Sequence, residues 1–207
     1  MLKVITLTLP PFETNTYIVF EKAKGKCIVI DPASNFQIIK NKIDEFELKP
    51  ILIFLTHGHF DHIGACDELR DAYNIPLAIH KYDASLITSP QLNASSLLSN
   101  KEINLRSAEK ILSEPTSFKL ESKTLRIIHT PGHTKGSCIL IGDDEIFSGD
   151  TLFKGGYGRY DLPGGNAEDL MKSLEKILNL DERLKIYPGH GESTTIYDEK
   201  STLRTFF

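Results

Sequence analysis

Cysteine is scarce in this 207-residue chain, and its three cysteines lie far apart without a Cys-x-x-Cys pair. The spacing of Cys27, Cys66 and Cys138 fits reduced, buried thiols better than a disulfide framework. For Cys138 we expect burial on a strand. The chain therefore offers no thiolate cluster for a cysteine-rich structural zinc site.

The chain also lacks an apolar run long enough to cross a bilayer, and its first ten residues alternate like a strand instead of forming a signal-peptide core. We therefore expect a cytoplasmic protein with no membrane partner. The net charge is −4 and no Lys/Arg-rich run is present, so nucleic acid is not an expected partner either. A small-molecule substrate is expected instead, and the sequence leaves the oligomeric state open.

Secondary-structure signals run along the whole chain, which has 40% hydrophobic residues and no repeats or linkers. Alternating apolar residues predict strands over residues 4–9, 16–20, 27–30, 77–79, 118–120, 125–129, 138–141, 145–147 and 184–187. Apolar residues at helical spacing, such as Ile38, Ile39, Ile43 and Phe46, predict helices over residues 35–47, 62–73 and 167–178. Residues 84–112 are polar and weakly periodic, so we expect a surface excursion of short helices beside a site. The pattern predicts two packed sheets with helices outside.

Residues 57–62 (HGHFDH) directly follow an apolar run and place four metal-binding side chains in six positions. The imidazole nitrogens and carboxylate oxygen of such a cluster suit zinc, iron or manganese. In an extended segment His57 and His59 point the same way, whereas the adjacent Asp61 and His62 diverge. The spacing therefore favours two ions.

Three later segments each place one ligand-type residue shortly after a predicted strand. These residues are His133 in PGHTKGS, Asp150 in SGDT and His190 in PGHG. A glycine precedes each of them, which lets the backbone approach a centre closely. Because the same arrangement recurs three times, we expect these residues to lie on one shared rim at the ends of the strands.

Together these motifs resemble the metallo-β-lactamase superfamily, and within it the glyoxalase II-like (hydroxyacylglutathione hydrolase-like) enzymes. The resemblance is carried by residues 57–62, residues 131–137 (PGHTKGS), residues 149–153 (GDTLF) and the pair Gly189-His190. The motifs occur in the family's order between residues 15 and 191. The resemblance implies an α+β fold, a four-layer αββα sandwich of two mixed β-sheets with the metal cleft at one edge.

The resemblance also implies a dinuclear metal site with seven ligands. One ion is held by His57, His59 and His133, the other by Asp61, His62 and His190, and Asp150 bridges both. Zinc is the expected metal, with iron and manganese as alternatives. The implied activity is that of a metal-dependent hydrolase, in which a hydroxide bridging the ions attacks a small thioester or ester. Asp61 is also the catalytic candidate that accepts a proton from the attacking water.

A glycine-rich loop follows Asp150 over residues 155–165 (GGYGRYDLPGG). It lacks a Walker lysine and the strand-to-helix context of a dinucleotide fingerprint, so it does not predict a phosphate site. The resemblance to small hydrolases implies that Arg159 in this loop binds an anionic substrate group, although Tyr160 stands where threonine is common. Two divalent ions with a hydroxide and two carboxylates would leave a positive cleft, which also favours an anionic substrate.

Two features separate the chain from glyoxalase II itself. The chain ends soon after His190, so we expect residues 1–207 to form a single hydrolase domain without a separate C-terminal substrate domain. Gly191-Glu192 stands where that enzyme has a tyrosine near the thiol-peptide. A smaller ester, thioester or lactone is therefore an equal alternative to a hydroxyacylglutathione-like substrate.

Two other functions compete with hydrolysis. A persulfide dioxygenase-like oxidoreductase of the same superfamily would use one iron held by positions that match His57, His133 and Asp150. A non-catalytic metal-binding domain would need a tight site without an open ligand position. A related RNA-processing nuclease is disfavoured because the chain is acidic and has no basic arm.

Two further histidines are not expected to be ligands. His80 follows a predicted strand and has the pattern of an ordinary strand-end residue, and His129 precedes the better-placed His133, so we expect a structural or supporting role for it. Side chains expected to form hydrogen bonds around the ligands are Asp31, Thr56, Thr134 and Ser137.

Overall fold

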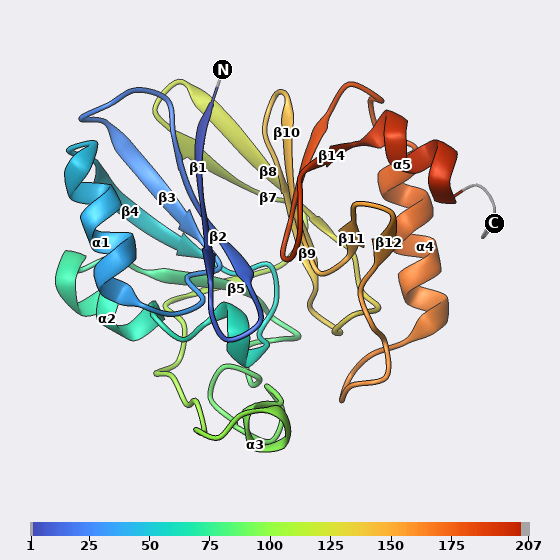
Figure 1. Cartoon of the computed structure of the whole chain (residues 1–207), viewed down its shortest axis with the longest axis horizontal. Coiled ribbons are helices and arrows are strands. Elements are labelled where there is room, and N and C mark those ends of the chain that lie inside the picture. Colours follow the sequence, from blue (N-terminus) through green and yellow to red (C-terminus); the bar gives the residue numbers. More distant parts are fainter. Residues whose placement is uncertain (1, 204–207) are drawn as a thin grey trace.

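The structure, a computed structural model, describes residues 2–203 as two β-sheets packed face to face, with helices on both outer faces (Figure 1). Each sheet has six strands, and each contains both parallel and antiparallel pairs. The predicted fold class, an α+β sandwich of two mixed sheets, is confirmed.

The first sheet is built by the amino-terminal half of the described chain. Its strands, in spatial order, are β1 (Lys3–Leu9), β2 (Thr14–Phe20), β3 (Lys26–Ile30), β4 (Lys49–Phe54), β5 (Leu77–His80) and β6 (Lys110–Leu112). The first three strands pair antiparallel and the last four pair parallel. Helices α1 (Phe36–Glu45) and α2 (Cys66–Tyr73) connect parallel neighbours and cover the outer face, as crossover helices do (Figure 1).

The second sheet comes from the carboxy-terminal half. Its strands, in spatial order, are β14 (Thr194–Thr195), β13 (Lys185–Pro188), β10 (Glu145–Gly149), β9 (Cys138–Ile141), β8 (Lys123–His129) and β7 (Thr116–Leu120). Helices α4 (Ala167–Leu178) and α5 (Ile196–Leu203) lie on its outer face, and β11 (Leu152–Phe153) forms a small separate hairpin with β12 (Gly156–Tyr157) (Figure 1).

Strands such as β2, β5, β9 and β10 bury both of their faces, which explains their largely apolar sequences. On β2, Tyr17 and Val19 face the second sheet, whereas Ile18 between them packs under the helices. On β9, Leu140 faces the inter-sheet core and Ile141 faces α4. Successive side chains of a strand point to opposite faces, so each of these strands contributes to two cores.

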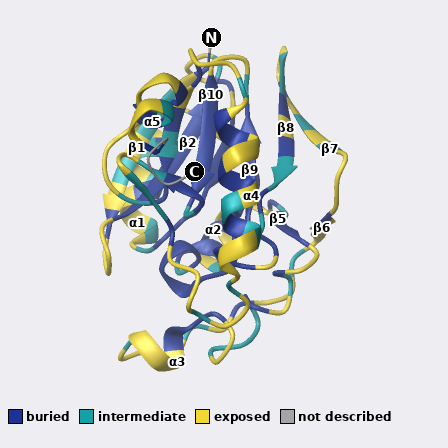
Figure 2. Ribbon diagram, turned by 90° about the vertical axis from the view of Figure 1, so that its right-hand side faces the viewer, coloured by how far each residue is buried: buried dark blue, intermediate teal, exposed yellow. Residues whose placement is uncertain are grey.

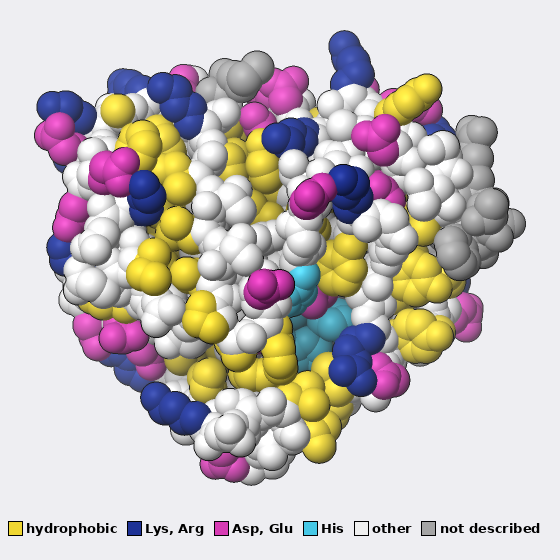
Figure 3. Space-filling view, in the orientation of Figure 1, with side chains coloured by type: hydrophobic (Ala, Val, Ile, Leu, Met, Phe, Trp, Pro, Cys, Tyr) yellow, Lys and Arg dark blue, Asp and Glu magenta, His cyan; other side chains and the backbone are white. Residues whose placement is uncertain are grey.

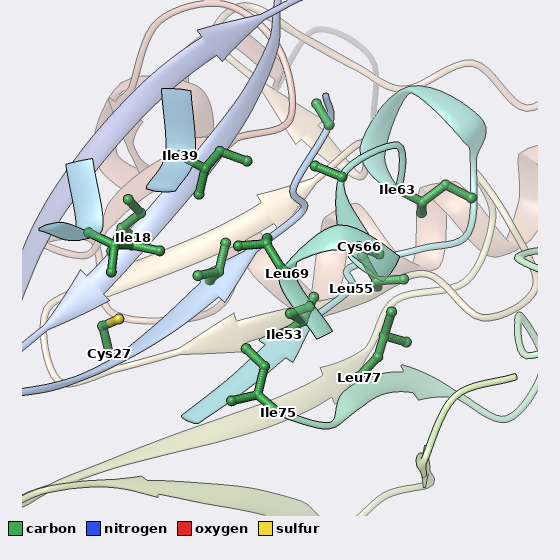
Figure 4. Close-up of a cluster of buried hydrophobic side chains, with 14 of the residues drawn as sticks. Ile18, Cys27, Ile39, Ile53, Leu55, Ile63, Cys66, Leu69, Ile75 and Leu77 are labelled. Carbon is green, nitrogen blue, oxygen red and sulfur yellow. The ribbon is translucent and has the colours of Figure 1, made fainter. Parts of the chain in front are cut away.

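The core beneath α1 and α2 is shown in Figure 4, where Ile39, Leu69 and Cys66 of these helices pack with Ile53 of β4 and with Leu55, which follows that strand. All five side chains are buried. The cysteine here acts as a small apolar residue, and Cys27, Cys66 and Cys138 are all buried and free, as predicted.

Helix α4 covers the second sheet with one apolar face. Its buried residues Leu170, Leu174 and Ile177 follow helical spacing, and the opposite face is exposed (Figure 2). The Asn166 side chain caps the helix by accepting a hydrogen bond from the Asp169 amide at 3.0 Å. The predicted range of residues 167–178 is confirmed.

Three expectations from the sequence were wrong in detail. Ile38 of α1 is 45% exposed, because Ile39 and Ile43 already occupy the face that meets the sheet. The helix predicted from residue 62 begins only at Cys66, after a 3₁₀ turn at Phe60–His62. The excursion over residues 84–112 holds the short helix α3 (Ser95–Leu98), but it ends in the strand β6. Among residues 2–203, no helix is long and apolar enough to cross a membrane.

Candidate metal centre

The seven predicted ligands meet at one edge of the sandwich, where strands of both sheets end. The segment after β4 carries His57 and His59, and the 3₁₀ turn that follows carries Asp61 and His62. The second sheet contributes the other three residues, from the segments after β8, β10 and β13: His133, Asp150 and His190. The site therefore forms only when the two sheets pack together.

One group of three imidazoles converges on a single point. The possible ligand atoms of His57, His59 and His133 all lie within 4.8 Å of one another, and all three side chains are buried. His59 Nδ1 lies 2.9 Å from His133 Nε2. Three inward-facing nitrogens with this spacing match a three-histidine metal site.

A second group lies beside the first. The possible ligand atoms of Asp61, His62 and His190 also lie within 4.8 Å of one another. The Asp61 Oδ2 atom is 3.4 Å from His190 Nε2 and 3.6 Å from His62 Nε2. This group combines two nitrogens with one carboxylate oxygen, a donor set that suits zinc, iron or manganese.

Asp150 lies between the two groups. Its Oδ2 is 3.6 Å from His133 Nε2 in the first group and 3.4 Å from His190 Nε2 in the second. Its Oδ1 is 3.4 Å from His62 Nε2. One carboxylate thus faces both groups, which is the position of a bridging ligand.

Polar atoms without partners test whether the site fits metal ions. Among the described residues, His57 Nε2, His62 Nε2 and Asp150 Oδ1 are buried and have no hydrogen-bond partner. Leaving such atoms unpaired costs free energy, on the order of 1–3 kcal/mol for each group. Cations held between these atoms would satisfy them, so the donor set fits two metal ions.

The second ring nitrogen of four of the five histidines is held by a specific partner. The Nδ1 atoms contact Thr56 Oγ1 at 3.1 Å (His57), Asp31 Oδ2 at 3.0 Å (His62), the Arg159 carbonyl at 2.7 Å (His133) and the Phe12 carbonyl at 3.0 Å (His190). An acceptor at Nδ1 keeps the proton there and leaves Nε2 free to bind a metal.

Asp31 forms a further converging group with His57 and His62, but its oxygens are already occupied. Oδ1 accepts the Thr56 amide at 2.8 Å, and Oδ2 accepts the Thr56 hydroxyl at 2.6 Å and His62 Nδ1 at 3.0 Å. Asp31 therefore orients the segment that carries His57 and His62. Supporting hydrogen bonds of this kind were expected from Asp31 and Thr56.

Asp83 joins two ligand segments and was missed by the sequence analysis. Its buried carboxylate accepts hydrogen bonds from the Gly58 amide at 3.0 Å, the Thr134 hydroxyl at 2.7 Å and the Gly136 amide at 2.7 Å. Burial raises the pKa of Asp83 despite these bonds. No spacing or motif singles out this residue, because its partners lie far away in the sequence.

Two glycines beside the ligands allow the close approach that the site requires. A Cβ atom at Gly189 would collide with the Asp150 carboxylate, and one at Gly149 would collide with the Thr56 side chain. Gly149 also has a positive φ of 49°, which disfavours other residues there. The Gly-Asp and Gly-His pairs of the sequence thus have a steric cause.

Burial and charge set the protonation of the ligands. Burial lowers the pKa of His57 well below its usual value and that of His59 to about 3, so both imidazoles are neutral. Burial opposes the charged form of His190 as well, but its hydrogen bonds to Asp150 and Asp61 raise its pKa to about 9. Burial likewise opposes ionisation of Asp150, but His62 and His190 hold its pKa well below its usual range. The carboxylate is therefore ionised and ready to bind a cation.

A cavity of about 440 Å³ opens over the two groups. In Figure 3 histidine side chains line a hollow in the surface, with hydrophobic side chains along its edge. The lining residues are Phe12, His59, Phe60, Asp61, Ala94, Leu98, His133, Asp150, Phe153, Arg159, Leu162 and His190. The excursion over residues 84–112 borders the site, as expected.

Arg159 lines this cavity, and its guanidinium already has a partner. Nε and Nη2 donate to the Asp161 carboxylate at 2.7 and 2.8 Å, and the side chain is 53% exposed. The backbone carbonyl of Arg159 accepts the hydrogen bond from His133. The residue thus contributes to the site by its backbone, while its predicted role in binding an anion stays a prediction.

His80 and His129 lie apart from the seven predicted ligands. Their rings stack at a centroid distance of 4.2 Å, and His129 Nε2 donates to the Lys135 carbonyl at 2.8 Å. Burial and the neighbouring His129 lower the pKa of His80 to about 4. Neither residue belongs to the converging groups found among residues 2–203.

Residues 9–190 match the family model described as the metallo-beta-lactamase superfamily. Probable metallo-hydrolase YqgX of Bacillus subtilis is 36% identical over 193 residues, which cover 92% of this chain and 90% of that protein. Two similar crystal structures are those of BLEG-1 B3 metallo-beta-lactamase (36% identity, TM-score 0.91, 97% of each chain covered) and of TTHA1623 in a di-iron-bound form (33% identity, TM-score 0.84, 96% of this chain and 98% of that one).

Proposed function

The chain belongs to the metallo-β-lactamase superfamily, and we propose that it is a glyoxalase II-like hydrolase of small thioesters or esters that works with two transition-metal ions. The observation that carries this proposal is the position of Asp150 between two groups of three ligand residues. A single ion in one group would leave the three residues of the other group without a metal.

The residues divide between the two ions as their contacts suggest. His57, His59 and His133 would hold one ion, Asp61, His62 and His190 the other, and Asp150 would contact both. When bound, the ions would supply Lewis-acid polarisation of a carbonyl and lower the pKa of a water molecule. Zinc, iron and manganese all suit this donor set, and the di-iron form of TTHA1623 supports iron as a candidate beside zinc.

Asp61 is the residue that we propose as proton acceptor. Its Oδ2 accepts a hydrogen bond from Thr14 Oγ1 at 3.1 Å and faces the cavity together with His190. Burial opposes ionisation of Asp61, yet His62 and His190 keep its pKa below the usual value. The carboxylate is therefore available at neutral pH to take a proton from a water molecule.

The substrate that we propose carries an anionic group. Arg159 stands at the cavity and its guanidinium is half-exposed, so an anion can approach it from solvent. The two hydrogen bonds to Asp161 orient the Arg159 guanidinium. A carboxylate of the substrate would compete with Asp161 for this guanidinium.

A second candidate function is the hydrolysis of a β-lactam amide. It is favoured by the 36% identity and TM-score of 0.91 to a protein described as a B3 metallo-beta-lactamase. The mononuclear iron dioxygenase alternative would use only His57, His133 and Asp150, and would give no role to the second group of ligands.

One experiment tests these candidates together. Protein purified without chelator or added metal is analysed for metal, and then assayed with hydroxyacyl thioesters, simple esters and a β-lactam. We expect two metal ions per chain and the highest kcat/KM for a thioester or ester. A single iron per chain with oxygen uptake would overturn the hydrolase proposal, and a preference for the β-lactam would promote the second candidate.

A further inference from the structure

Apart from Arg159, the walls of the cavity over the candidate metal centre are apolar wherever they are not predicted metal ligands. Of the twelve described residues that line it, five are predicted ligands and six are apolar: Phe12, Phe60, Ala94, Leu98, Phe153 and Leu162. The remaining one is Arg159, whose guanidinium is paired with Asp161. The part of a substrate that leads away from the reacting bond therefore meets few polar side chains.

Hydrogen bonds of Asn93 hold the part of the apolar wall that carries Leu98. The buried side chain of Asn93 donates to the Ile103 carbonyl at 2.8 Å and accepts the Ser95 amide at 2.9 Å. The backbone carbonyl of Asn93 accepts a hydrogen bond from the Phe60 amide at 3.0 Å, next to the predicted ligand Asp61. Asn93 thus ties the segment that carries Leu98 to the metal-binding turn.

Aromatic contacts fix another part of the wall. The rings of Phe12 and Phe60 pack edge to face at 5.6 Å, and Phe153 packs edge to face on His190 at 6.0 Å. Phe12 is 50% exposed, and its backbone carbonyl contacts His190 Nδ1. Phe12 therefore places an apolar side chain at the cavity mouth and also orients the predicted ligand His190.

We propose that this cavity binds the acyl side of the substrate, and that the acyl group is a hydrocarbon chain. The proposal rests on the hydrolase function proposed above. A chain lying against Phe12, Leu98 and Leu162 would bury apolar surface on both sides. A hydroxyacyl group would instead place its hydroxyl against hydrocarbon, where loss of hydration costs free energy. The anionic part of the substrate then belongs to the leaving group, on the side of Arg159.

The size of the cavity limits the chain. If each non-hydrogen group takes roughly the 30 Å³ of a water molecule in the liquid, a cavity of 440 Å³ holds about 15 such groups. This volume accommodates a medium-length acyl chain together with the ester or thioester group. A long fatty acyl chain would extend past the mouth into solvent.

The test compares metal-loaded wild type with two neighbouring variants on p-nitrophenyl acetate, butyrate, hexanoate and octanoate. We expect kcat/KM to rise about fourfold for each added methylene until the cavity is filled, a factor that corresponds to ~0.8 kcal/mol. Leu98→Asp places a charge in the wall and should flatten this series. Leu97→Asp is the matched control, because Leu97 lies on the same helix α3, is 68% exposed and does not line the cavity.

A binding measurement separates the acyl site from catalysis. Displacement of the fluorescent probe 1-anilinonaphthalene-8-sulfonate by 1-octanol and 1-butanol is measured for the metal-free and metal-loaded protein. We expect 1-octanol to displace the probe at much lower concentration than 1-butanol from wild type and Leu97→Asp, and the difference to shrink in Leu98→Asp. Leu98→Ala, with a smaller effect of the same direction, replaces the aspartate variant if that variant fails to fold.

The two measurements distinguish a failure of the acyl-chain proposal from a failure of the hydrolase proposal. Equal rates along the ester series, or equal effects of Leu97→Asp and Leu98→Asp, would overturn the acyl-chain proposal and leave the hydrolase intact. If no ester or thioester is hydrolysed by the metal-loaded protein while 1-octanol still binds at Leu98, the hydrolase proposal fails and the apolar site stands.

Discussion

The Thr134 hydroxyl donates a hydrogen bond of 2.7 Å to the Asp83 carboxylate, and this contact helps to join two segments that carry predicted metal ligands. Asp83 also accepts the amide of Gly58, which lies between His57 and His59. Thr134 directly follows His133 in the sequence. Asp83 therefore sets the distance between the ligands that come from different sheets.

Asp83→Asn is expected to weaken metal binding. An amide keeps the shape of the carboxylate but turns one acceptor into a donor, which would face the donors of Gly58, Thr134 or Gly136. The loss of a hydrogen-bond acceptor behind metal ligands typically costs about 10- to 100-fold in metal affinity. Competition with a chromophoric chelator measures the affinity. Asp71→Asn is the control, since Asp71 is exposed and pairs with Arg106, and equal affinities of the two variants would argue against this role.

Stability of the metal-free protein is expected to fall between about pH 6.5 and pH 9. The hydrogen bonds to Asp150 and Asp61 raise the pKa of His190 to about 9 although burial opposes it. A histidine with a raised pKa in the folded state stabilises the protein fully below its unfolded pKa, and this stabilisation is lost as the pH rises through the folded pKa. Urea unfolding of chelator-treated protein at several pH values measures the effect. His190→Ala should flatten the profile, and a profile unchanged by that variant would contradict the assignment.

Asp150→Ala is expected to remove metal and activity to a far greater extent than His80→Ala. Asp150 faces both ligand groups, with oxygens 3.4 Å from His62 and from His190. His80 stacks on His129 and lies outside both groups. Elemental analysis and the ester assay measure the two losses. Similar metal content and similar activity in both variants would remove Asp150 from the bridging position.

Local motifs predicted much of this site because its ligands are concentrated in short segments. Residues 57–62 indicated a metal centre without any knowledge of the fold, and the glycines before Asp150 and His190 fit the crowding that the structure has. The apolar periodicity of α4 was also sufficient to predict the bounds of this helix, since one helix face packs on one sheet. Local patterns predict well where a single short segment determines the outcome.

Contacts between distant segments escaped prediction. Asp83 and Asn93 are isolated polar residues in the sequence, and their roles depend on partners brought together by the two sheets and the excursion. The strand β6 has only three residues and pairs with β5 at the edge of the sheet, so it has little pattern of its own. Ile38 was placed on the wrong face because its neighbour Ile39 fits the same spacing.

Arg159 supplies a prediction that separates its two contributions to the site. Its backbone carbonyl holds His133 Nδ1 at 2.7 Å, whereas its exposed guanidinium pairs with Asp161. Arg159→Ala keeps the backbone contact, so the metal content should not change. The variant is expected to raise KM for an acidic thioester by up to about fivefold, because an exposed ion pair contributes at most about 1 kcal/mol. KM for a neutral ester should change little.

Asp161→Ala is the complementary variant and should act in the opposite direction. Without its carboxylate partner, the Arg159 guanidinium is free to pair with the anionic group of the substrate, so KM for the acidic thioester should fall. Steady-state kinetics with one acidic and one neutral substrate measure both variants, at low and at high salt, since salt screens an exposed pair. If neither variant distinguishes the two substrates, Arg159 serves the site only through its carbonyl, and selection of an anionic substrate would depend on the metal ions alone.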